Sequence, residues 1–184
     1  MANIFIIHGA YGSPEENWFQ WLKIELEKNG QKVYTPKFPT PENQSLAQWL
    51  EVIEGYGSEI NAETIFIGHS VGVPFILNIL SKKNYPIKAA YFVAGFVSDL
   101  NIDSIREINS SFVKNFNWTQ IKENCKNFII FNSDNDPYVP IAKAGELAEH
   151  LSVTPIIIAG AGHFNEVAGY TKFDLLLQKV KELI

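Results

Sequence analysis

Cysteine is almost absent from this chain of 184 residues, because Cys125 is the only one. A single cysteine excludes an intramolecular disulfide framework and suits a reducing compartment. A chain of this length buries roughly 70% of the surface that it exposes when unfolded, so it needs neither a disulfide nor a metal ion for stability. We therefore expect one cytoplasmic domain over residues 1–184, without a structural metal or an organic cofactor.

Long apolar runs and an excess of basic residues are also missing. No stretch approaches the roughly 20 apolar residues that span a bilayer, and the run Ile4–Ile7 is too short for the apolar core of a signal peptide. Fifteen Lys and Arg stand against 20 Asp and Glu, which gives a net charge of −5, and the densest cationic pair is Lys82–Lys83. We therefore expect no binding to membranes or nucleic acids.

Short apolar or β-branched runs alternate with longer amphipathic segments along the whole chain. Several of the runs are apolar at consecutive residues, as in strands that are covered on both faces. The predicted strands are Asn3–His8, Gln31–Thr35, Thr64–Gly68, Lys88–Ala94, Asn127–Ser133 and Thr154–Ala159. The predicted helices are Glu15–Asn29, Ser45–Ile60, Val71–Lys83, Thr119–Asn124, Ile141–His150 and Lys172–Leu183.

This alternation predicts an α/β fold in which six parallel strands form one sheet between two helical layers, a three-layer α/β/α sandwich. The segment Gly95–Asn117 is the longest one without a predicted element. Segments of this length in a compact domain are usually functional or contain a short helix. Two interpretations stay open here: a cap near a functional site, or an unrecognised helix.

The pattern Gly-x-Ser-x-Gly occurs at Gly68–Gly72, directly after a predicted strand and before a predicted helix. A serine nucleophile needs this strand–turn–helix setting, because its Oγ must stand clear of the carboxyl edge of the sheet. The two glycines remove side chains that would collide at the tight turn. Ser70 is therefore the predicted nucleophile.

A serine nucleophile needs a base, usually a histidine that is oriented by a carboxylate, and on such a sheet the chain order is Ser, acid, His. His163 follows the last predicted strand, in a loop whose glycines allow the chain to fold back over the sheet edge. Asp136 precedes a proline in the loop after the fifth strand and is the preferred acid. Asp134 in the same loop and Asp99 are the alternatives.

Acyl transfer also requires backbone N–H donors for the developing oxyanion. One predicted donor is Val71, the residue after the nucleophile, and the other is Ala10 in the loop after the first strand, with Tyr11 as the alternative. The same loop lacks the Gly-x-Gly-x-x-Gly spacing of a dinucleotide-binding turn.

These segments together resemble the α/β-hydrolase superfamily, and within it the compact retinoblastoma-binding serine-hydrolase (YdeN-like) family. The resemblance covers essentially the whole chain and is carried by the patterns His8-Gly9, Gly68–Gly72, Asp136–Pro140 and Gly162-His163-Phe164-Asn165. It implies a trimmed hydrolase sheet, a triad of Ser70, Asp136 and His163, and no metal or cofactor.

The expected activity is hydrolysis of carboxylic esters or similar small acyl substrates through an acyl-serine intermediate. Aromatic and apolar residues that flank the motifs are candidates for an acyl pocket: Tyr11, Phe96, Tyr138, Val139 and Phe164. Two alternatives stay open: an amide hydrolase of the serine aminopeptidase type, which uses the same groups, and a protein-interaction module on the same fold. No feature of the sequence indicates a protein partner.

Overall fold

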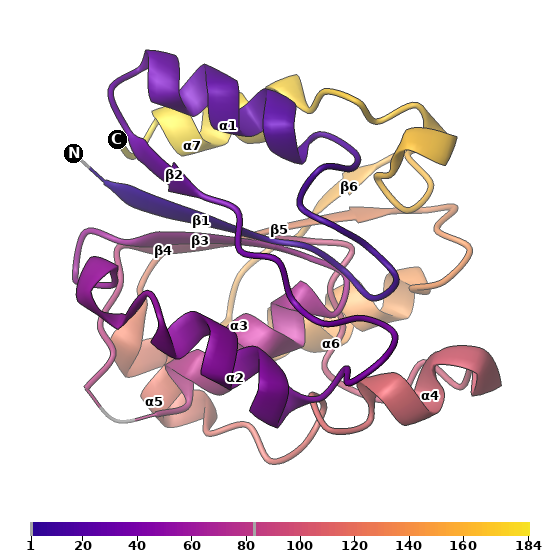
Figure 1. The fold of residues 1–184 in the computed structure, drawn as a ribbon. Coiled ribbons are helices and arrows are strands. Elements are labelled where there is room, and N and C mark those ends of the chain that lie inside the picture. Colours follow the sequence, from indigo (N-terminus) through magenta and orange to yellow (C-terminus); the bar gives the residue numbers. More distant parts are fainter. Residues whose placement is uncertain (1, 83) are drawn as a thin grey trace.

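Six parallel strands form one sheet in the order β2-β1-β3-β4-β5-β6 in the computed structural model, which describes residues 2–82 and 84–184 (Figure 1). The strands are β1 (Asn3–Ile7), β2 (Lys32–Tyr34), β3 (Ile65–His69), β4 (Ala89–Val93), β5 (Phe128–Ser133) and β6 (Ile156–Ile158). All five pairings are parallel, as the sequence predicts.

Helices cover both faces of this sheet. They are α1 (Phe19–Lys28), α2 (Leu46–Glu54), α3 (Gly72–Leu80), α4 (Asp103–Asn109), α5 (Trp118–Asn124), α6 (Ile141–Leu151) and α7 (Asp174–Lys181). Figure 1 shows α1 and α7 above the sheet and α2, α3, α5 and α6 below it. The predicted α/β/α sandwich is confirmed.

The alternation of side chains along each strand divides the core into two parts. In β1, Ile4 and Ile6 pack toward α1 and α7, whereas Phe5 and Ile7 pack toward α2 and α3. Every residue of β3 and β4 is buried, since these central strands are covered on both faces.

Several predicted boundaries differ from the structure. The predicted helix Glu15–Asn29 begins only at Phe19, and the helix predicted over Ser45–Ile60 ends at Glu54, followed by a 3₁₀ turn at Gly57–Glu59. The helix predicted over Val71–Lys83 ends at Leu80. Lys83, and with it the pair Lys82–Lys83, lies outside the described residues.

The segment Gly95–Asn117 contains a helix that the sequence analysis did not assign, α4. It is only seven residues long, has no side-chain cap, and buries only Asn109, so its sequence lacks a long apolar stripe. Figure 1 shows α4 apart from the helices that cover the sheet, on the side where the strands end. The helix thus lies where a cap over the sheet edge would lie.

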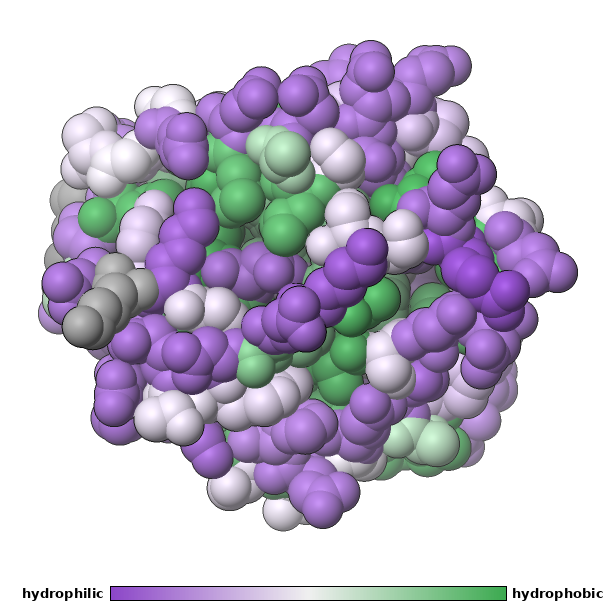
Figure 2. Space-filling model, turned by 90° about the horizontal axis from the view of Figure 1, so that it is seen from below, coloured by the Kyte–Doolittle hydropathy of each residue, from purple (hydrophilic) through white to green (hydrophobic). Residues whose placement is uncertain are grey.

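The lower helical layer presents a mostly hydrophilic surface, with hydrophobic side chains visible between the hydrophilic ones (Figure 2). Helix α3 lies inside this layer, and eight of its nine residues are buried. None of the described helices is long and apolar enough to cross a membrane.

The strand order reverses direction at β1, so that the connections from β1 and β3 leave the sheet on opposite sides. In open parallel sheets a crevice forms at such a point, outside the carboxyl ends of the strands. The Gly9 loop after β1 and the Ser70 turn after β3 flank this crevice. The sheet topology therefore brings two of the predicted motifs side by side.

The β3–α3 turn is packed so closely against β1 that it demands glycine. A Cβ on Gly72 would lie 2.7 Å from the carbonyl oxygen of Ile7. We expect Gly72→Ala to lower the free energy of unfolding by about 1–3 kcal/mol, because the backbone must shift to admit the methyl group. Urea unfolding at neutral pH measures this loss.

Gly145→Ala is the matched control. Gly145 lies in α6 and is exposed, and a Cβ there would meet nothing within 4 Å. Since alanine loses less conformational freedom than glycine in a helix, this variant should gain about 0.5–1 kcal/mol. Equal effects of the two substitutions would contradict the assigned packing of the turn.

Candidate functional site

Ser70 occupies a strained turn between β3 and α3. Its φ is 56°, in the left-handed region that a residue with a side chain adopts rarely. A Cβ on Gly68 would lie 2.7 Å from Ile76 Cδ1 and 2.9 Å from the carbonyl oxygen of Gly72. The strand–turn–helix setting that the sequence predicts is confirmed, and both glycines are required by close contacts.

His163 and Asp136 are joined by a hydrogen bond of 2.8 Å between Nδ1 and Oδ2. The Asp136 side chain is completely buried, and its Oδ1 accepts hydrogen bonds from the N–H groups of Tyr138 and Val139 at 2.9 and 3.0 Å. Backbone donors of this kind stabilise an ionised carboxylate. An Nδ1 that donates to a carboxylate leaves Nε2 of His163 free to accept a proton.

Ser70 and His163 line one cavity of about 600 Å³ at the carboxyl edge of the sheet. In the described part of the chain no hydrogen bond joins the Ser70 hydroxyl to the imidazole. Such contacts are often long in ligand-free sites and tighten when substrate binds. The structure therefore brings Ser70, Asp136 and His163 to one place, without a hydrogen bond between the Ser70 hydroxyl and His163.

The two alternative acids have other partners. Asp134 Oδ1 accepts a hydrogen bond of 2.8 Å from the N–H of Gly160, so this side chain ties the β5 loop to the loop after β6. Asp99 forms an ion pair with Arg106 at 3.0 Å. Asp136 is accordingly the carboxylate that the fold places at His163.

The predicted oxyanion donors are distinguished by their hydrogen bonds. The N–H of Tyr11 donates to Thr40 Oγ1 at 2.6 Å and is therefore occupied. The N–H groups of Ala10 and Val71 make no hydrogen bond within residues 2–82 and 84–184. A Cβ added to Gly9 would lie 3.0 Å from Ser70 Cβ, so the loop that carries Ala10 lies against the Ser70 turn.

His69, inside the Ser70 motif, has a structural role that the sequence analysis missed. Its Nε2 donates to the carbonyl oxygen of His163 at 2.8 Å, and the two rings lie 4.7 Å apart. Burial, together with the neighbouring imidazole of His163, lowers the pKa of His69 to about 3. His69 is therefore neutral, and it fixes the backbone of His163.

The other two histidines lie outside this arrangement. His8 is buried, and its pKa is lowered chiefly by that burial. Its Nε2 accepts a hydrogen bond of 3.0 Å from the N–H of Phe38. His150 stacks on Trp118 with ring centroids 4.1 Å apart. Among the described residues, His163 is thus the histidine at the cavity that is hydrogen-bonded to a carboxylate.

A clamp on the His163 loop is a second feature that the sequence analysis missed. The N–H of Asn17 donates to Glu166 Oε1 at 3.0 Å, and the N–H of Glu166 donates to Asn17 Oδ1 at 2.9 Å. Trp18 Nε1 donates to the carbonyl oxygen of Phe164 at 3.0 Å. These partners are about 150 positions apart along the chain, so no local pattern signals them.

The five candidates for an acyl pocket divide between the cavities and the core. Tyr11 and Tyr138 line the cavity and are 56% and 47% exposed, whereas Val139 and Phe164 are completely buried core residues. Phe96 borders a second cavity. The segment Gly95–Asn117 forms a cap on the Ser70 cavity. It contributes Leu100 and three residues of α4 to the cavity wall: Ser104, Ile105 and Asn109.

A metal site is not formed by the described residues, among which no group of three or more His, Cys, Asp or Glu is placed to hold an ion. The arrangement brings together a serine on a strained turn, an imidazole oriented by a carboxylate, and two backbone N–H groups that have no hydrogen-bond partner among the described residues. These are the groups that acyl transfer to a serine requires.

Comparison with known proteins shows the family to which the chain belongs. The family model described as "Serine hydrolase" matches residues 4–182. YdeN of Bacillus subtilis (strain 168) is 26% identical over 175 residues, which are 94% of this chain and 91% of that protein. The serine hydrolase RBBP9 of Rattus norvegicus is 28% identical over 180 residues, which are 96% of this chain and 91% of that protein.

Solved structures show the same fold. The crystal structure of the ydeN gene product from B. subtilis has a TM-score of 0.90 at 24% identity, with 100% of this chain and 98% of that chain covered. An extracellular alpha/beta-hydrolase from a Paenibacillus species has a TM-score of 0.69 at 15% identity, with coverage of 100% and 99%. The chain has an α/β-hydrolase fold and belongs to the serine hydrolase family.

Proposed function

We propose that this serine hydrolase cleaves carboxylic esters of small acyl groups, with Ser70, His163 and Asp136 as its catalytic triad. The observation that carries the proposal is the 2.8 Å hydrogen bond between His163 Nδ1 and the buried carboxylate of Asp136, at the wall of the cavity that Ser70 also lines. A binding protein has no physical need for a buried carboxylate that is hydrogen-bonded to an imidazole, because burying a carboxylate costs free energy.

The first half of the reaction forms an acyl-serine. Ser70 Oγ attacks the ester carbonyl carbon while His163 Nε2 takes the hydroxyl proton, and ionised Asp136 stabilises the imidazolium. The N–H groups of Ala10 and Val71 donate to the oxyanion. As the tetrahedral intermediate collapses, the C–O bond to the alcohol breaks and the alcohol leaves with the proton from His163.

The second half removes the acyl group by the same steps with water as the nucleophile. His163 takes a proton from the water that attacks the acyl carbon, and then returns this proton to Ser70 Oγ as the carboxylic acid leaves. No step needs a metal ion or an organic cofactor, since every proton moves between His163, Ser70, water and the leaving group.

The walls of the Ser70 cavity favour a small substrate. The cap consists of one helix of seven residues and the adjoining loop, which leaves room for a small molecule beside the elbow. Amide hydrolysis would use the same groups, because the triad acts on any acyl carbonyl. Turnover of an ester and of the amide with the same acyl group distinguishes the two activities.

Ser70→Ala tests the nucleophile. We expect a fluorophosphonate probe to label the wild-type protein and not this variant, and hydrolysis of p-nitrophenyl acetate to fall by at least about 10³-fold. Ser58→Ala is the control, because Ser58 is exposed and lines neither cavity. Undiminished turnover in Ser70→Ala would reject the proposed mechanism.

Asp136→Asn tests the orienting carboxylate against its neighbour in the same loop. We expect kcat to fall by about 10⁴-fold, because the amide holds the imidazole in the wrong tautomer and cannot stabilise its protonated form. Asp134→Asn, which keeps an oxygen for the N–H of Gly160, should retain activity within about tenfold. If steady-state kinetics show the larger loss in Asp134→Asn, the assignment of the acid is wrong.

His69→Gln tests the neutral histidine behind His163. A histidine whose pKa is 6.5 when unfolded and about 3 when folded takes up a proton on unfolding, so acid favours unfolding as the pH falls from about 6.5 toward 3. Between pH 7 and pH 5 this group alone removes about 2 kcal/mol of stability. Urea unfolding at both pH values should show a smaller pH dependence in the variant; an identical one would contradict the burial of a neutral His69.

A further inference from the structure

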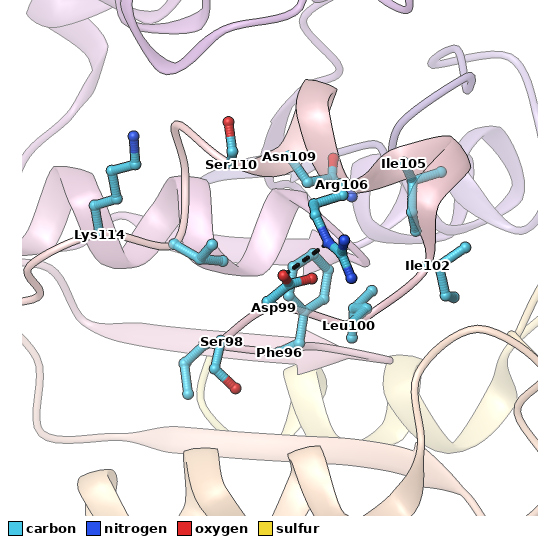
Figure 3. A pocket seen from close by; sticks show the side chains of 12 residues that line it. Phe96, Ser98, Asp99, Leu100, Ile102, Ile105, Arg106, Asn109, Ser110 and Lys114 are labelled. Carbon is cyan, nitrogen blue, oxygen red and sulfur yellow. Dashed lines mark ion pairs between the residues drawn. The ribbon is translucent and has the colours of Figure 1, made fainter.

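A second cavity, of about 240 Å³, lies beneath α4 (Figure 3). Half of the side chains that line it are apolar: Phe96, Val97, Leu100, Ile102, Ile105 and Val113. The other half of the lining is polar or charged. By volume alone, a cavity of about 150 Å³ with an apolar lining already holds benzene. The larger cavity here therefore has room for a six-membered ring or for a branched or medium-length aliphatic chain.

The cavity is the immediate neighbour of the Ser70 site. Leu100, Ile105 and Asn109 line both cavities, so the two are separated by single side chains. The loop that carries Phe96 and Leu100 leaves β4 next to the elbow, where the N–H of Ser70 donates to the carbonyl oxygen of Val93 at 2.9 Å. An acyl group attached to Ser70 can thus reach this cavity by displacing one or two apolar side chains.

Charge at the cavity favours a neutral occupant. Arg106 pairs with Asp99 at 3.0 Å and with Asp103 at 2.9 Å, so its charge is already neutralised. Figure 3 shows Arg106 and Asp99 facing one another, and the amine of Lys114 pointing away from them. Arg106 and Asp99 are each about half exposed, which places the ion pair at the outer rim.

We infer that this cavity is the acyl pocket of the enzyme and takes an apolar acyl group of about the size of a hexanoyl or benzoyl group. The inference rests on the proposed function. The acyl group stays bound until water attacks, so a pocket with apolar side chains in its wall suits it. The alcohol must depart early, and the Ser70 cavity offers it the side where Tyr11 and Tyr138 are exposed.

Two variants change the volume of the pocket in opposite directions. The assay compares p-nitrophenyl hexanoate with p-nitrophenyl acetate, which differ in the acyl group and share one leaving group. Val113→Phe fills the cavity, and we expect the hexanoate-to-acetate ratio of kcat/KM to fall about tenfold, as it does when a pocket loses the space for a few methylene groups. Ile105→Ala opens the partition to the Ser70 cavity, and the ratio should rise several-fold. Ile157→Ala is the matched control, because Ile157 is exposed on β6 and lines neither cavity.

The outcomes separate this inference from the function on which it rests. Circular dichroism first shows which variants are folded. A ratio within about twofold of the Ile157→Ala control in either folded variant, or a shift in the opposite direction, overturns the acyl pocket while Ser70-dependent turnover persists. Absence of Ser70-dependent turnover in the wild-type protein instead overturns the proposed function, and the acyl pocket with it.

Discussion

The site depends on one close approach, that of the β3–α3 turn to the carboxyl end of β1. A Cβ on Gly72 would lie only 2.7 Å from the carbonyl oxygen of Ile7, and a Cβ on Gly9 would lie 3.0 Å from the Cβ of Ser70. Next to this contact, the backbone of Ser70 is left-handed, with a φ of 56°. Strain in the turn is thus held by the packing of two buried strands.

Electrostatics at His163 follow from what is buried and what is hydrogen-bonded. Asp136 is fully buried, and two backbone N–H groups donate to its carboxylate. His69 is also buried but has only a carbonyl oxygen as its partner, so its pKa falls to about 3 and it stays neutral. The two neighbouring imidazoles differ because, among the described residues, that of His163 is hydrogen-bonded to a carboxylate and that of His69 to a carbonyl oxygen.

The cap distinguishes this chain from a bare hydrolase sheet. Helix α4 and the loop before it supply residues to both cavities, and the ion pair of Arg106 and Asp99 joins this helix to that loop at the rim. A half-exposed ion pair contributes about 0–1 kcal/mol to stability, so this pair alone holds α4 to the loop only weakly. Specificity on this fold lies in such short variable segments, whereas the sheet supplies the chemistry.

Local patterns determined the parallel sheet and the strand–turn–helix at Ser70, because consecutive apolar residues and paired glycines have few alternative structures. Chain order and loop chemistry also indicated Asp136 and His163, which the fold brings within 2.8 Å. Only the tertiary structure decided the partners of His69, the clamp between Asn17 and Glu166, and the position of α4. Those contacts join residues that are far apart along the chain, and a helix of seven residues with few buried side chains leaves no periodic signal.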